Sequence, residues 1–120
     1  AIEQFPEYPD ALAGLGVALI NVHRPEAALP YLRRAVARKP DHTLGRTNLA
    51  AALILLDRVP EAVDEYRRAI ALDPDAPPPH FGLARAYLLL GRMDLAREEY
   101  RVVERLDPRL AGLMRGAFGE

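Results

Sequence analysis

A period of 34 residues runs through this chain and constrains its fold more than any other feature. Pro40, Pro74 and Pro108 mark it, each lying 34 residues after the one before. Leucines, small residues and aromatic residues coincide at the same spacing. The aligned sets are Leu15, Leu49 and Leu83; Gly16, Ala50 and Ala84; Leu19, Leu53 and Tyr87; Ala28, Ala62 and Ala96; Leu32, Tyr66 and Tyr100; and Ala35, Ala69 and Val103. Such a period predicts an array of small units that bury their apolar faces against one another.

Each unit is predicted to hold two helices, because its apolar residues recur every three or four positions. The predicted ranges are 10–22 and 25–38, then 43–56 and 60–72, then 78–90 and 93–106. The aligned small residues allow two helices to approach closely. Each proline ends a second helix, because it has no N–H and disfavours helix for the residue before it. Asp41 and Asp75 are expected to cap the following helices, and Pro30 is expected to kink the helix that contains it.

The pattern resembles the tetratricopeptide repeat (TPR) family, in which a large residue is followed by Leu-Gly, Tyr, Ala, an aromatic residue, Ala and Pro. Three copies are predicted, at 9–42, 43–76 and 77–110. The resemblance implies an all-α fold, a right-handed superhelical stack of helix-turn-helix repeats known as an α-solenoid. The chain departs from the pattern at the first large position. Copy one has Leu12 there, whereas the other copies have Arg46 and His80.

Both ends of the chain also carry parts of the pattern. Residues 1–8 match the end of a preceding repeat's second helix, since Pro6 lies 34 residues before Pro40. We therefore expect a fragment of a larger multi-repeat protein, with a degenerate lead-in as the alternative. Residues 109–120 are expected to form a capping helix or the truncated start of the next repeat. The residues expected to cover the last repeat are Leu110, Leu113, Met114 and Phe118.

In the TPR family the first helices line a concave groove, and the resemblance assigns a second set of side chains to it. Most of them are apolar, which favours a groove that binds a peptide or protein segment. Burial against neighbouring repeats is the alternative for each residue. The expected groove residues are Asp10, Ala13, Val17, Ile20 and Asn21 in copy one, Leu44, Thr47, Asn48, Ala51 and Ile54 in copy two, and Phe81, Gly82, Arg85, Leu88 and Leu89 in copy three.

Asn48 is the main polar candidate in this groove, because its amide can both donate to and accept from a peptide backbone. Glycines replace it in the other two copies, at Gly14 and Gly82. The chaperone-binding subgroup of the family clamps a C-terminal carboxylate with lysines, asparagines and an arginine. The other positions that match this clamp hold Ala13, Val17, Pro78 and Gly82, so this partner class is excluded.

Composition argues against catalysis in this segment. The chain contains no Cys and no Ser, and its three histidines lack the spacing of a metal site. It also has no glycine-rich phosphate loop. We therefore expect no catalytic residue, no cofactor and no metal. The longest apolar run, Leu49 to Leu56, is too short to span a membrane, and no targeting signal is evident. A soluble segment is expected, with a cytoplasmic location favoured.

The formal net charge of −1 argues against a nucleic-acid partner. Copy one nevertheless carries a local basic strip, formed by Arg33, Arg34, Arg38 and Lys39. An acidic partner or nucleic acid is one interpretation of the strip, and a solvated helix face is the other.

Taken together, these features predict a non-catalytic scaffold for protein–protein interaction. Two alternatives stay open. The ends of the repeat array could mediate self-association, giving a homo-oligomer. The segment could also recruit the substrate of an enzyme whose catalytic domain lies outside it.

Overall fold

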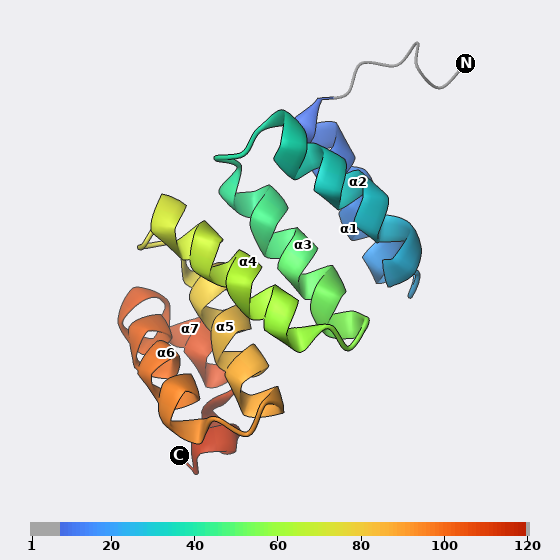
Figure 1. Ribbon diagram of the computed structural model, residues 1–120. Coiled ribbons are helices and arrows are strands. Elements are labelled where there is room, and N and C mark those ends of the chain that lie inside the picture. The colour runs from blue at the N-terminus through green and yellow to red at the C-terminus, as the bar shows by residue number, and fades with distance from the viewer. Residues whose placement is uncertain (1–7, 120) are drawn as a thin grey trace, which may run out of the picture.

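The computed structural model describes residues 8–119, which form helices joined by short turns (Figure 1). Six of the helices make three antiparallel pairs, and each begins and ends within one residue of the predicted range. The pairs are α1 (Pro9–Asn21) with α2 (Pro25–Arg38), α3 (Thr43–Leu55) with α4 (Val59–Leu72), and α5 (Pro77–Leu89) with α6 (Met93–Leu106). Successive pairs stack along an axis, since α2 contacts α3 and α4 contacts α5. The result is an α-solenoid, elongated to 53 × 25 × 22 Å.

The turn inside each pair has the same backbone geometry in all three copies. His23, Asp57 and Gly91 share one repeat position and have φ values of 63°, 60° and 74°. The N–H of the next residue donates to a carbonyl five residues back, at 2.8 Å in each copy. This is the Schellman motif, which ends helices with one left-handed residue. The motif holds two non-glycine residues in a region that side chains disfavour.

The starts of α3 and α5 differ from the prediction. Asp41 and Asp75 do not cap them, because the N-cap residues are His42 and Ala76, one residue later. Neither N-cap makes a side-chain hydrogen bond to the helix. Pro30 lies inside α2, which continues through it.

The segment after α6 covers the end of the third pair. It consists of α7 (Pro108–Gly112) and the short 3-10 helix η2 (Arg115–Phe118). Asp107 caps α7, since its Oδ1 accepts a hydrogen bond of 3.2 Å from the N–H of Leu110. This carboxylate satisfies a helix N–H that would otherwise lack a partner.

The buried side of this segment consists of Ala111, Met114 and Phe118, which follow one another at helical spacing. Phe118 stacks on Tyr100 of α6, with ring centroids 4.4 Å apart. Leu113 was expected to join them, but 76% of it is exposed. It lies one residue outside the buried spacing, so its side chain points to solvent.

Tyr66 of α4 reaches beyond its own pair and packs on α5. Its ring tip lies over Gly82, where an added Cβ would overlap with it. Copy two has Asn48 at the position of Gly82, and the residue aligned with Tyr66 in copy one is the shorter Leu32. The longer tyrosine therefore leaves no room for a side chain at residue 82.

In copy two the first large position of the repeat holds a charged residue, Arg46. Arg46 donates from Nη1 to Oε1 of Glu65 at 2.9 Å, and from Nε to the Pro40 carbonyl at 3.0 Å. The side chains of Arg46 and Glu65 are only 13% and 14% exposed. In copy one the corresponding residues are Leu12, which is buried, and Tyr31, which is half-buried.

Copy three repeats this arrangement with a histidine. Nδ1 of His80 lies 2.6 Å from Oε1 of Glu99, and Nε2 lies 2.7 Å from the Pro74 carbonyl. A protonated imidazole can donate to both acceptors, as the guanidinium of Arg46 does. Each basic side chain thus joins the exit of the preceding pair to the second helix of its own pair.

This polar junction predicts a strong coupling between positions 46 and 65. Arg46→Leu alone leaves Glu65 with only the longer 3.7 Å pair to Arg68, and Glu65→Tyr alone leaves Arg46 without its carboxylate. Each single change should cost about 3 kcal/mol, because a largely buried charge loses its main partner. The double variant reproduces the apolar combination of copy one and should recover most of that loss. Urea unfolding followed by circular dichroism measures the free energies of unfolding. Additive losses in the double variant would contradict the coupling.

The packing of Tyr66 on Gly82 predicts opposite effects of alanine at two glycines. Gly82→Ala should lower the free energy of unfolding by about 2 kcal/mol, because the added methyl group forces the buried Tyr66 ring out of its packed position. The matched control is Gly14→Ala, at the same repeat position, where a Cβ would meet nothing within 4 Å. There alanine should stabilise the helix by up to about 1 kcal/mol. Equal stabilisation by both changes, measured by thermal unfolding, would show that the ring leaves room.

Candidate functional site

The first helices α1, α3 and α5 contact one another in succession and form the inner face of the solenoid. The expected groove residues on this face have three levels of exposure. Half-buried are Val17, Ile20, Thr47, Asn48, Ala51, Ile54, Phe81 and Leu88; exposed are Asp10, Asn21, Leu44, Arg85 and Leu89; buried are Ala13 and Gly82. Ala13 is only 2% exposed, so it belongs to the core and not to the groove.

Four of the half-buried residues also touch the core, namely Ile20, Ile54, Phe81 and Leu88. These four side chains are therefore packed against the core and still partly exposed. One side of each packs within the repeat array, and the other side faces solvent. An apolar surface of this kind is held in place by the core beneath it.

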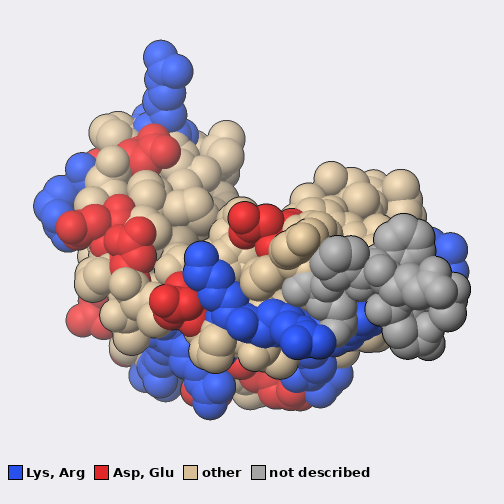
Figure 2. Space-filling view, turned by 90° about the horizontal axis from the view of Figure 1, so that it is seen from above, with Lys and Arg blue, Asp and Glu red and all other residues tan. Residues whose placement is uncertain are grey.

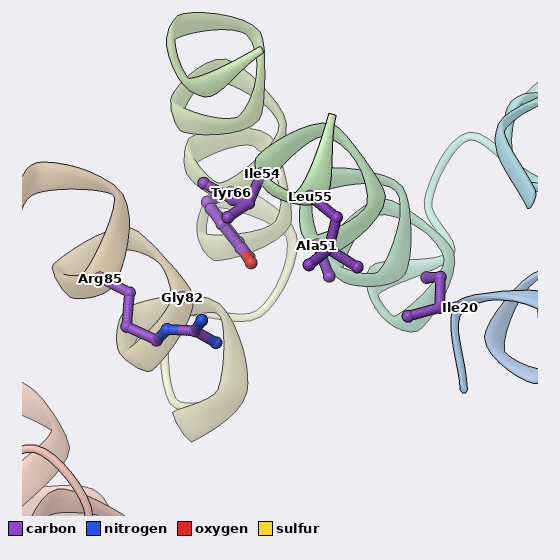
Figure 3. A pocket seen from close by; sticks show the side chains of 7 residues that line it. All are labelled: Ile20, Ala51, Ile54, Leu55, Tyr66, Gly82 and Arg85. Carbon is purple, nitrogen blue, oxygen red and sulfur yellow. The ribbon is translucent and has the colours of Figure 1, made fainter. Parts of the chain in front are cut away.

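A pocket of about 170 Å³ lies where α1, α3, α4 and α5 meet (Figure 3). An apolar cavity of about 150 Å³ is large enough for a benzene molecule. The pocket therefore has room for one aliphatic side chain. Its lining residues are Ile20, Ala51, Ile54, Leu55, Tyr66, Gly82 and Arg85.

Sequence reasoning placed five of these residues in the groove but missed Leu55 and Tyr66. Tyr66 aligns with core residues of the other copies, Leu32 and Tyr100, so the repeat pattern alone predicts a packing role for it. Tyr66 also lines the pocket, because its ring reaches across to Gly82 and forms one wall. The sequence does contain a signal for this wall of the pocket. It is a large aromatic residue, Tyr66, followed by a glycine, Gly82, at the groove position of the next copy.

Tyr66 places a hydroxyl group at the pocket. Its side chain is buried, and burial raises the pKa of the hydroxyl to about 12, although the charge of Arg85 acts in the opposite direction. The group therefore stays neutral and can donate a hydrogen bond at ordinary pH. Within residues 8–119, Tyr66 makes no hydrogen bond.

Arg85 lies across the pocket from this hydroxyl. In Figure 3, its guanidinium and the Tyr66 oxygen point toward the same space. Arg85 is exposed, and among the described residues no carboxylate pairs with it. Arg58, by contrast, makes two hydrogen bonds of 2.8 and 2.7 Å to Glu61, which raise its own pKa and lower that of Glu61. Arg85 is thus a positive charge available to a ligand.

The two polar residues predicted on α3 behave differently from each other. Thr47 is satisfied within its helix, since Oγ1 donates to the Thr43 carbonyl at 2.8 Å. The amide of Asn48 is half-buried and makes no hydrogen bond to any of residues 8–119. Asn48 therefore keeps a free donor and a free acceptor on the inner face.

The basic strip lies on α2 and its exit, and all four of its residues, Arg33, Arg34, Arg38 and Lys39, are exposed. Nη2 of Arg33 is 3.9 Å from Oε2 of Glu61, and the guanidinium of Arg34 lies 5.9 Å from the ring centre of Tyr31. Seen from above the view of Figure 1, acidic and basic side chains lie close together (Figure 2). Glu61 thus offsets part of the positive charge of the strip.

A second hollow, of about 330 Å³, lies on this side between α2, α3 and α4. Glu65 in its lining pairs with Arg46 at 2.9 Å and with Arg68 at 3.7 Å. The charges of Arg46, Glu65 and Arg68 in this hollow are therefore paired with one another, whereas Arg85 in the inner pocket has no such pair among the described residues.

Between residues 8 and 119, no three His, Cys, Asp or Glu side chains are grouped as ligands for a metal ion. In the same part of the chain, no helix has both the length and the apolar character needed to cross a membrane.

Comparison with solved structures places this fold among TPR solenoids. YrrB, described as a TPR protein with an unusual peptide-binding site, superposes with a TM-score of 0.86 at 23% identity, over 96% of this chain and 60% of YrrB. MamA from MSR-1 gives 0.77 at 27% identity, over 90% of this chain and 62% of MamA. The second TPR of Spaghetti (RPAP3), bound to an HSP90 peptide, gives 0.79 at 21% identity, over 82% and 92%. The chain thus spans about 60% of the length of the YrrB and MamA structures.

Sequence comparison points to the same family. A TPR repeat model matches residues 50–91, and a tetratricopeptide repeat model matches residues 80–111. No curated protein sequence gives a significant match. The 34-residue period, the paired helices and these two matches agree, and the chain belongs to the tetratricopeptide repeat family.

Proposed function

We propose that this chain is a non-catalytic scaffold that binds a peptide or protein segment along its inner face. The observation that carries the proposal is the pocket between Ile20, Ile54 and Arg85, which joins apolar walls to unpaired polar groups. Apolar surface with a few convergent polar groups is the usual composition of a binding site. The core holds this surface in place, so binding a segment requires little rearrangement of the scaffold.

Asn48 supports the same proposal from the turn before the pocket. It precedes Ala51 by three residues on α3, so both lie on one side of the helix. In this proposal the Asn48 amide binds the backbone of a segment whose side chain enters the pocket. This combination of backbone and side-chain contacts is typical of peptide recognition.

Two structural neighbours give further support. YrrB is described as having a peptide-binding site, and the RPAP3 domain was solved with an HSP90 peptide. Their identities to this chain are low, so they support peptide binding in general and not a particular peptide.

Ile54→Asp should strongly weaken segment binding, because a carboxylate in the apolar wall is costly to desolvate. The test selects displayed random 12-residue peptides on the wild-type chain and measures their affinity by fluorescence anisotropy. We expect a loss of about 30-fold or more in Kd, of the order seen for central interface residues. The control is Leu113→Asp, an equal change at a residue that is 76% exposed outside the groove. Unchanged affinity for a folded Ile54→Asp variant would contradict groove binding.

The outer face of α1 favours a second candidate, self-association. Leu15 is 44% exposed, whereas the aligned Leu49 and Leu83 are 2% and 3% exposed. Those two residues are covered because a preceding helix pair packs on α3 and α5. The same face of α1 is apolar, with Ala11, Leu15 and Ala18 exposed, and the exposed Val22 follows directly after the helix. A second copy of this chain, packed α1 against α1, would bury it.

Sedimentation velocity over a range of concentrations tests this candidate. We expect the wild-type chain to shift toward dimer at high concentration, and Leu15→Asp to remain monomeric because the charge interrupts the apolar face. A monomer at all concentrations, or an equal dimer in both proteins, would rule out association through α1.

A further inference from the structure

We infer that the inner pocket binds an acidic–aliphatic segment, in which an aliphatic side chain fills the pocket while a neighbouring Asp or Glu carboxylate contacts Tyr66 and Arg85. This inference rests on the proposed function, because it specifies the occupant of the same inner face. It makes the groove selective for charge as well as for apolar character.

The preference for an aliphatic side chain follows from the apolar walls of the pocket. Ile20, Ala51, Ile54 and Leu55 give it a hydrocarbon surface from α1 and α3. A volume of about 170 Å³ accommodates one side chain and not a helix. A segment that inserts a single aliphatic side chain therefore fits this hollow.

The preference for a carboxylate follows from Tyr66 and Arg85, the two polar residues that line the pocket. The Tyr66 hydroxyl and the Arg85 guanidinium both donate hydrogen bonds, and they point into one space (Figure 3). Neither has a hydrogen-bond or ion-pair partner within residues 8–119. A group that satisfies both donors must accept hydrogen bonds, and a negative charge makes both bonds stronger. A carboxylate meets these requirements with its two oxygens.

The charge of the lining favours a single carboxylate from within a segment. Arg85 is the one charged residue among the seven that line the pocket. One guanidinium balances one carboxylate. The inner face also continues beyond the pocket to Val17 on α1 and to Phe81 and Leu88 on α5. A bound segment therefore meets further half-buried apolar side chains on α1 and α5 besides the lining of the pocket.

The test begins with displayed random 12-residue peptides whose C-termini are fused to the carrier, selected on the intact 120-residue chain. The best peptide is then synthesised as a C-terminal amide, together with a version in which Glu is replaced by Gln or Asp by Asn. Fluorescence anisotropy gives Kd for each peptide with the wild type, Arg85→Gln, Tyr66→Phe and Arg109→Gln. The last variant is the matched control, because Arg109 is also exposed and unpaired within the described chain but lies on α7.

Selected peptides should carry Asp or Glu next to Leu, Ile or Val. Arg85→Gln should weaken the acidic peptide about tenfold, as expected for loss of a charge-assisted contact, and leave the neutral peptide unchanged. Tyr66→Phe keeps the ring that packs on Gly82 and should weaken the acidic peptide about threefold. Arg109→Gln should alter neither Kd by more than about twofold, since it removes the same charge far from the contact.

Three results would overturn the inference. If the selected peptides depend on Ile54 but show no preference for Asp or Glu, the inferred carboxylate contact is wrong, whereas the proposed function is unaffected. Binders that appear only in a parallel library displayed with free C-termini would show that the acceptor is a chain end. If no peptide binds, or if the peptides still bind a folded Ile54→Asp variant, the proposed function is contradicted as well.

Discussion

Close contact between the two helices of each pair is the constraint on which the rest of this structure depends. It occurs at alanines that are 0% exposed in every copy, Ala28, Ala62 and Ala96. Residues without a long side chain let the helix backbones approach, so the larger side chains four positions later must fill the remaining space. Leu32 does so within its own pair, over Gly16, whereas Tyr66 extends to the next pair.

Packing and surface chemistry are therefore coupled through the same side chain. Where the second helix carries the shorter Leu32, the next first helix has room for Asn48. Where it carries Tyr66, the next first helix must have Gly82, and the tyrosine hydroxyl stands in the groove instead of an amide. One change of a core residue thus alters both the shape and the hydrogen-bonding groups of the inner face. This explains how repeats of one pattern present different surfaces.

The sequence predicted the helices closely, because the 34-residue period combines many weak preferences at fixed positions. It predicted less about residues whose surroundings come from another repeat. Leu15 aligns with two buried leucines, yet it is exposed because no described helix packs on the outer face of α1. Tyr66 was assigned to the core because alignment compares equivalent positions and not neighbours in space. The prediction for Leu113 is wrong because the buried positions of this segment are 111, 114 and 118, which place Leu113 on the solvent side.

In the proposed complex, the two donors of the pocket contribute in different ways. Arg85 is exposed, so water satisfies it when no ligand is present, and its charge mainly draws acidic segments toward the groove. The Tyr66 hydroxyl belongs to a buried side chain, and a bound segment would separate it from the remaining water. A segment without an acceptor at that point leaves the hydroxyl unsatisfied, which costs more than an ordinary hydrogen bond contributes. Tyr66 therefore disfavours segments that lack an acceptor, whereas Arg85 favours those that carry charge, and selectivity requires both.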